Sequence, residues 1–297
     1  MSNQNDAHSL RTGLLVLYAS ILLLALNGFF AKAIPLDATG ITQMRSVVAC
    51  IALFLLLLVQ KSSFRLGSVR EFIGVYALGV VLAVHWVTYF HAMQVSTVAI
   101  GMLALFSYPV ITVLIEPIFK GLWPKPVDIF AACVVLFGVF LMVSEDVLAG
   151  ELDNGAFLGA IWGVISAILF SLRNTTQKYA YPHVNSIALM AHQTLIVAVL
   201  LIPFIEFEAL KNLNMNAWGM LILLGCLSTA MAHTFLSMSL KRLSAKTVGL
   251  ISCNTPVFGA AIAWLVLGEV PSTMVYVGGV VILAVAAWET LKGSTQS

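Results

Sequence analysis

Long apolar stretches separated by short polar connections run along the whole chain. Windows of about 20 predominantly apolar residues, the length that crosses the hydrocarbon core of a bilayer as a helix, recur ten times. These windows cover residues 13–34, 40–60, 71–91, 97–119, 126–145, 156–179, 185–207, 216–238, 245–267 and 273–291. The pattern therefore predicts an all-α membrane protein with ten transmembrane helices.

Composition supports a protein that lies in lipid. Of the 297 residues, 60% are hydrophobic and 9% are charged, whereas soluble domains carry about 25% charged residues. The first span lacks a small-residue cleavage site, so we expect it to stay in the protein rather than to be a signal peptide. The net charge of +2 is too small to indicate a nucleic-acid partner. The four cysteines lie in apolar runs without the spacing of a disulfide framework or a metal site.

Lysine and arginine are distributed unevenly over the connections. Ten spans put both termini on one side of the membrane. If that side is the cytoplasm, the inner segments hold 11 of the 15 basic residues and the outer ends hold only Lys32 and Lys211. Because cytoplasmic loops carry an excess of Lys and Arg, we expect the N- and C-termini to be cytoplasmic.

The two halves of the chain resemble each other at a nearly fixed offset. The stretch SILLLALNGFFAKA matches SAILFSLRNTTQKYA at an offset of 146, which aligns Lys32 with Lys178. Further on, FSYPV matches CNTPV at an offset of 147, which aligns Pro109 with Pro256. Since each repeat holds five spans, the second must enter the membrane in the opposite orientation, and the expected architecture is an inverted repeat, common among secondary transporters. The two repeats cover residues 13–145 and 156–291.

Two prolines lie in the middle of predicted spans. Pro109 and Pro256 each remove a backbone hydrogen bond and clash with the preceding turn, so we expect both helices to bend or break there. Polar residues flank both prolines and either cap the freed carbonyls locally or contact a ligand. They are Ser107 and Tyr108 in the first copy, and Ser252, Asn254 and Thr255 in the second.

The sixth span carries a polar face. Ser166, Arg173 and Gln177 share this face, with Asn174 beside it. A charged residue in a span is a functional candidate by default. The alternative is that Arg173, roughly 9 Å from the inner end of the span, snorkels to the interface.

Two further charges lie in or near spans. Glu116, at comparable depth in the fourth span, is expected to pair with Arg173 as part of an inner gate. Arg45 is a weaker candidate, because snorkelling from the outer end of the second span accounts for it.

Aromatic and polar side chains cluster in the third span. His85 and Tyr89 share a face with Trp86 beside them, and aromatics with a polar tip suit recognition of a flat or amphipathic solute. The alternative is an interfacial aromatic girdle.

Three more intramembrane residues are candidates. His192 and His233 could carry a coupling proton, because histidine titrates near neutral pH; hydrogen-bonded packing is the alternative for each. Asn27 aligns with Arg173 in the repeat and is a further candidate for the cavity.

The sequence lacks several short motifs that are typical of nucleotide-binding proteins, metalloproteases and serine hydrolases. It contains no Walker-type GxxxxGK[ST], no HExxH, and no GxSxG with plausible partners. We therefore expect no enzyme activity, no cofactor and no bound metal, and the sequence argues against primary active transport by this chain alone.

Two stretches resemble a known family. They are WVTYFHAMQVSTVAIGMLALFSYPVITVLI in the third and fourth spans, and LKRLSAKTVGLISCNTPVFGAAIAWLVLGEVPS around the ninth. Together with the ten spans and two repeats, they are similar to the EamA family of the drug/metabolite transporter superfamily, over essentially the whole chain. The resemblance implies a carrier in the bacterial inner membrane, with a central cavity. It implies that Asn27, Tyr89, Ser107, Arg173, His233 and Asn254 are cavity residues.

The first repeat departs from the family pattern. Where the second repeat has LGE, ending at Glu269, the first has Phe119-Lys120-Gly121. Its acidic residue is Glu116, so a symmetric role for the two glutamates is not expected. Glu269 is most simply a structural loop cap.

The function expected from these features is secondary transport by alternating access. The first choice is export of amino acids or related neutral or zwitterionic metabolites, by facilitated diffusion, exchange or proton coupling. The alternatives are an uptake carrier for an aromatic solute such as a vitamin, and a non-transporting membrane receptor or scaffold. The sequence leaves the substrate, the direction, the coupling ion and the oligomeric state open.

Overall fold

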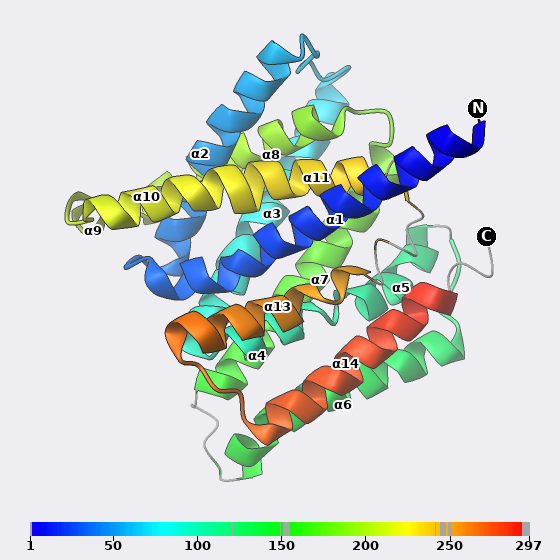
Figure 1. Ribbon diagram of the computed structural model, residues 1–297, viewed down its shortest axis with the longest axis vertical. Coiled ribbons are helices and arrows are strands. Elements are labelled where there is room, and N and C mark those ends of the chain that lie inside the picture. The colour runs from blue at the N-terminus through cyan, green and yellow to red at the C-terminus, as the bar shows by residue number, and fades with distance from the viewer. Residues whose placement is uncertain are drawn as a thin grey trace.

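We describe the protein from a computed structural model. It describes residues 2–119, 121–148, 150, 155–240, 242–243, 248 and 251–292. Within these ranges every regular element is a helix (Figure 1). Three of the basic residues counted above for the orientation, Lys120, Lys241 and Lys246, lie outside the described residues.

Seven described helical stretches are long and apolar enough to cross a membrane. They are Arg11–Ala33, Ala38–Val59, Val69–Val95, Val98–Phe119, Pro126–Glu145, Gly155–Ala180 and Met215–Leu236. Three shorter apolar helices follow the remaining predicted spans: Ser186–Leu200, Thr255–Leu267 and Thr273–Trp288. The all-helical, multi-spanning class is thus confirmed, whereas the number of ten membrane crossings stays a prediction.

The helices form one bundle (Figure 1). In chain order they are α1 (Ser2–Ala33), α2 (Ala38–Val59), α3 (Val69–Val95), α4 (Val98–Leu105), α5 (Tyr108–Phe119), α6 (Pro126–Leu148), α7 (Gly155–Ala180), α8 (Ser186–Leu200), η1 (Ile202–Phe204), α9 (Phe207–Lys211), α10 (Met215–Leu223), η2 (Leu224–Met231), α11 (Ala232–Leu240), α13 (Thr255–Ile262), η3 (Ala263–Leu267) and α14 (Thr273–Lys292).

α1 packs against α11 and α13, and α6 and α14 lie side by side at one edge. α1 begins and α14 ends at the same end of the bundle (Figure 1), which we name the terminal end; the opposite end, where α1 finishes, is the distal end.

Both mid-span prolines lie where a helix restarts. α4 ends at Leu105 and α5 begins at Tyr108, so Pro109 is the second residue of α5. Pro256 is likewise the second residue of α13. Proline is tolerated in a first turn because its missing N–H would have no partner there. The regular helix is therefore interrupted within these two spans.

Two segments have π-helical geometry, which the sequence pattern did not indicate. They are η2, between α10 and α11, and η3, which follows α13. η2 packs closely on α2: a Cβ added to Gly225 would meet Val48 Cβ at 2.5 Å and the carbonyl oxygen of Arg45 at 3.0 Å. π-Helical turns are rare and often mark functional sites.

Large apolar side chains cover the outside of the bundle. Leu55, Leu265 and Val280 expose 56%, 75% and 68% of their surface. In water such a surface would drive association, whereas in a bilayer it contacts lipid tails. The exposed apolar surface therefore agrees with a multi-pass membrane protein.

Candidate solute-binding cavity

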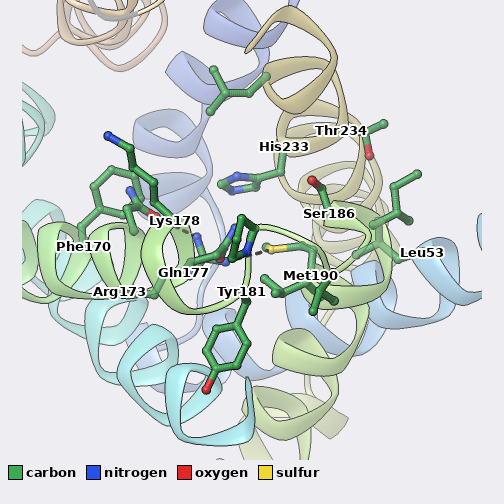
Figure 2. Close-up of a pocket in the computed structure, with 16 residues that line it drawn as sticks. Leu53, Phe170, Arg173, Gln177, Lys178, Tyr181, Ser186, Met190, His233 and Thr234 are labelled. Atoms are coloured by element: carbon green, nitrogen blue, oxygen red, sulfur yellow. Dashed lines mark hydrogen bonds between the residues drawn. The ribbon is translucent and has the colours of Figure 1, made fainter. Parts of the chain in front are cut away.

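A cavity of about 490 Å³ lies between α7, α8 and α11 (Figure 2). We name it the terminal chamber, because it reaches the connection between α7 and α8 at Tyr181 and Pro182. Its polar wall includes Arg173, Asn174 and Gln177 of α7. Cavities of roughly 300–1,000 Å³ hold small molecules in proteins, so the volume fits a metabolite.

A smaller cavity of about 90 Å³, the deep chamber, adjoins the first. Phe170, His233 and Leu236 line both chambers, so the two lie next to each other, and we refer to them together as the passage. Among the predicted site residues, the deep chamber is lined by Asn27, His85, Trp86, Tyr89, Tyr108, His233 and Ser252. Arg45, Phe106 and Thr255 also line it.

Arg173 is held inside the bundle by neutral partners. It is 5% exposed. Its Nε donates to Gln193 Oε1 at 2.9 Å, and Nη2 also donates to that oxygen. Nη1 donates to Asn174 Oδ1 at 3.0 Å, and Nη2 lies 3.5 Å from Met190 Sδ (Figure 2). Arg173 therefore does not snorkel to an interface.

The expected pair between Glu116 and Arg173 is wrong. Glu116 Oε1 accepts a hydrogen bond from Lys178 Nζ at 2.8 Å and another from the Tyr179 hydroxyl. Lys178 lies more than one turn beyond Arg173 on α7, with its side chain 65% exposed. The reason is depth. Gln193 on α8 retains Arg173 in the interior, whereas Lys178, nearer the helix end, reaches Glu116.

Arg45 is also buried, at 1% exposed, so the expectation that it snorkels is wrong. Its Nε donates to Thr229 Oγ1 of η2 at 3.0 Å. Its guanidinium carbon lies 4.5 Å from the ring centroid of Trp86 and 4.9 Å from that of Phe90. These rings supply cation–π contacts and hold the guanidinium in the wall of the deep chamber.

His85 links α3 to α7. Its Nδ1 lies 2.7 Å from Ser166 Oγ and 3.0 Å from the Ser166 carbonyl oxygen, and Ser166 Oγ donates to the His85 carbonyl oxygen at 2.9 Å. The His85 and Tyr89 rings are stacked, with centroids 6.3 Å apart. The polar atoms of His85 thus serve packing between helices while its ring faces the chamber.

Two predicted cavity residues cap helix turns and line neither chamber. Ser107 Oγ donates to the Ala104 carbonyl oxygen at 2.8 Å. Asn254 Nδ2 donates to the Ile251 carbonyl oxygen at 2.9 Å, and this residue is exposed. The structure therefore favours the local capping alternative for both.

The two histidine candidates lie in different surroundings. His233 lines both chambers, with its ring centroid 6.2 Å from that of Trp86. His192 lies outside them: its Nε2 is 2.6 Å from the Phe64 carbonyl oxygen and its Nδ1 is 3.4 Å from the Tyr76 hydroxyl. A coupling role for either stays a prediction.

The distal end is tied together by polar contacts. Glu269 Oε2 accepts a hydrogen bond from the Val98 backbone N–H at 2.8 Å, at the start of α4. Its Oε1 lies 3.7 Å from Lys32 Nζ, which donates to the Ser96 carbonyl oxygen at 2.6 Å. Gln94 Nε2 donates to the Leu36 carbonyl oxygen at 2.8 Å. Glu269 thus caps a neighbouring helix rather than its own loop.

Sequence reasoning missed several residues of the site. Gln193 and Met190 of α8 hold Arg173, and Phe170 lines both chambers. An amide in an apolar span was a signal for Gln193, since it needs a polar partner there. Met190 and Phe170 carry no such signal.

Comparison with known proteins gives the family. The model of the EamA-like transporter family matches the chain twice, over residues 11–144 and 157–288. The Uncharacterized transporter YxxF of Bacillus subtilis is 22% identical over 92% of this chain and 88% of its own length. The Pseudopaline exporter CntI of Pseudomonas aeruginosa is 23% identical over 94% of this chain and 96% of its own length.

A solved structure shares the fold. It superposes with a TM-score of 0.63 at 17% sequence identity, over 95% of this chain and 98% of that chain. The family match in both halves accounts for the two-repeat architecture of the helical bundle. The chain belongs to the EamA-like transporter family, whose members carry small solutes across membranes.

Proposed function

We propose that this protein is a secondary transporter that exports small organic metabolites, amino acids or related neutral or zwitterionic solutes, by alternating access. One observation carries the proposal. Two adjoining chambers lie between the α7–α8 connection and Arg45, while Lys32, Gln94 and Glu269 tie the distal end together. A solute cavity that reaches toward one end of the bundle, with the other end closed by contacts, is what one state of an alternating-access carrier requires.

The direction of transport follows from two supports. The Lys and Arg distribution predicts that the terminal end faces the cytoplasm, so a solute would enter the terminal chamber from the cell interior. One relative is named an exporter. Export is therefore our proposal. Uptake of an aromatic solute is the alternative, because the same cavity would face the outside in the other state of the transport cycle.

The two five-helix units, 13–145 and 156–291, would supply the moving parts. In an inverted repeat, the two units exchange conformations when the carrier switches sides. Lys32 and Lys178 align between the repeats, and each contacts a glutamate at its own end of the bundle. Opening of the distal end would then require the Lys32–Glu269 contact to break.

Flux into and out of proteoliposomes tests the proposal. The purified full chain is reconstituted, loaded with one unlabelled amino acid, and assayed for uptake of the same labelled amino acid by counterflow. We expect counterflow of at least one amino acid above protein-free liposomes, and an unchanged rate for Arg65→Gln, an exposed residue in the connection after α2.

Absence of counterflow for a broad panel, with binding of those solutes intact, would contradict transport and favour the receptor alternative. Measuring the rate with an imposed pH gradient tests proton coupling. A rate that responds to the gradient in the wild type but not in His233→Gln would assign the coupling proton to the passage.

A further inference from the structure

Two arginines are buried in the passage, and no carboxylate of the described part of the chain lies there with them. Arg45 and Arg173 are 1% and 5% exposed. Their hydrogen-bond partners are Thr229, Gln193, Asn174 and Met190, which are all neutral. Among the described residues, no carboxylate lines either chamber. Burial of an uncompensated charge is costly, so the passage is electrostatically suited to an anionic group.

Arg45 keeps a free donor. Its Nε is used by Thr229, but its Nη1 is buried and has no hydrogen-bond partner. The residue lines the deep chamber, and the rings of Trp86 and Phe90 pack against the guanidinium. The guanidinium is therefore fixed in place with an unsatisfied N–H group beside the cavity. A carboxylate is the usual partner for such a fork.

Two further residues that line the same chamber each have a buried polar atom without a partner. Asn27 Oδ1 and Thr255 Oγ1 are buried without a partner. Asn27 Nδ2 donates to the Leu24 carbonyl oxygen at 2.8 Å, which leaves its Oδ1 as the available atom. A free donor and free acceptors in one small cavity complement a group that carries both an acid and an N–H or O–H.

The volumes of the two chambers indicate which part of a solute each one holds. The deep chamber, at about 90 Å³, has room for a small polar head group only, whereas the terminal chamber, at about 490 Å³, has room for the remainder. Phe170 and Tyr108 lie at the deep chamber with Trp86 and Tyr89, so the neighbouring surface is aromatic.

On the basis of the transport function proposed above, we infer that the solute carries a carboxylate which binds Arg45 in the deep chamber, with an adjacent amino or hydroxyl group donating to Asn27. Arg173 does not contact this carboxylate, because Gln193 and Asn174 already accept from it. It contributes positive potential along the path. The ligand class is a small carboxylic acid with an apolar or aromatic body.

Matched acids and amides test this inference. The binding of L-phenylalanine, L-leucine and nicotinate to the purified full chain is measured by calorimetry beside L-phenylalaninamide, L-leucinamide and nicotinamide. In each pair the carboxylate is replaced by a carboxamide of nearly the same size, and the nicotinate pair makes this change without an α-amino group. We expect at least one acid to bind about tenfold or more tighter than its amide, because a charge-assisted hydrogen bond in a buried site has this strength.

Variants assign the effect to Arg45. Arg45→Gln should weaken binding of the preferred acid by about tenfold to a hundredfold and abolish discrimination against the amide. Arg45→Lys keeps the charge without the fork and should retain part of the discrimination. Arg65→Gln, which removes an exposed cation, should bind as the wild type does. Gel filtration and melting temperature establish that each variant is folded.

Two results would overturn the inference. One is equal binding of every acid and its amide by the wild type. The other is acid selectivity that persists in folded Arg45→Gln. The counterflow assay tests the transport proposal separately from the carboxylate site. Arg45-dependent binding of an acid without flux would support the carboxylate site and contradict transport. Flux only of solutes that lack a carboxylate, unchanged in Arg45→Gln, would retain transport and reject the carboxylate site.

Discussion

Lys32 Nζ lies 3.7 Å from Glu269 Oε1, and the pair joins the end of α1 to the segment after η3. The lysine that aligns with Lys32 in the second repeat, Lys178, lies 2.8 Å from Glu116 Oε1. Aligned lysines thus contact glutamates at opposite ends of the bundle, although the local sequences around the two glutamates differ. This pseudo-symmetric relationship was not expected from the sequence, which argued against a symmetric role for Glu116 and Glu269.

Glu269 makes two separable contributions to stability. Glu269→Gln keeps an acceptor for the Val98 N–H but loses the ion pair, so we expect a decrease of about 0.5–1 kcal/mol in the free energy of unfolding. Glu269→Leu also loses the helix cap, which adds about 1 kcal/mol. Denaturant unfolding in detergent micelles measures both.

Glu208→Gln is the matched control for Glu269. Its ion pair with Lys211 has side chains 80% and 68% exposed, so its loss should leave stability unchanged. Equal stability of Glu269→Gln and Glu269→Leu would contradict the capping role.

Glu116 should couple to Lys178 and not to Arg173. A double-mutant cycle with Glu116→Gln and Lys178→Gln should give an interaction energy of up to about 1 kcal/mol, because the pair is partly exposed. The same cycle with Arg173→Gln should give a value near zero. Unfolding free energies of the four proteins in each cycle supply the measurement, and the reverse order of the two couplings would contradict the observed contacts.

Hydropathy and backbone chemistry made much of the fold accessible from the sequence. Apolar windows identify membrane helices because lipid leaves few alternatives to a helix. The restart beside Pro109 follows from the missing N–H of proline. The π-helical geometry of η2 could not be predicted from hydropathy or from proline positions. Gly225 of η2 lies in close contact with Val48 of α2, and a contact between two distant spans is not visible in the local sequence.

The depth of a charged side chain was the main quantity that the sequence could not supply. Counting residues from the end of a span made snorkelling reasonable for Arg45 and Arg173. Both are buried because Thr229 and Gln193, on other helices, accept their hydrogen bonds. The wrong partner was predicted for Glu116 for the same reason. Lys178, and not Arg173, has the depth along α7 and the position around the helix axis that bring it to Glu116.

Gln193 should stabilise the fold through Arg173. Gln193→Leu removes the acceptor of two guanidinium N–H groups and leaves a buried cation short of partners, so we expect a loss of about 1.5–3 kcal/mol in unfolding free energy. Gln193→Glu retains an acceptor and should recover most of this stability. Thr176→Ala changes a half-buried residue of α7 whose hydroxyl donates only to the Leu172 carbonyl oxygen of its own helix, so it should cost less than about 0.5 kcal/mol. A Gln193→Leu protein as stable as Thr176→Ala would contradict the contact.

The close approach of α7 to α4 depends on Gly163. A Cβ at this position would lie 2.5 Å from Ala104 Cβ and 3.3 Å from the Gly101 carbonyl oxygen. Since neither a Cβ nor a backbone can rotate away, Gly163→Ala should separate the helices and cost about 1–3 kcal/mol. Gly219→Ala in α10 is the control, because its added Cβ meets no atom within 4 Å. It should be neutral or stabilise by up to about 1 kcal/mol through helix propensity alone. Melting temperatures in one detergent compare the two variants, and an equal response at both glycines would contradict tight packing at Gly163.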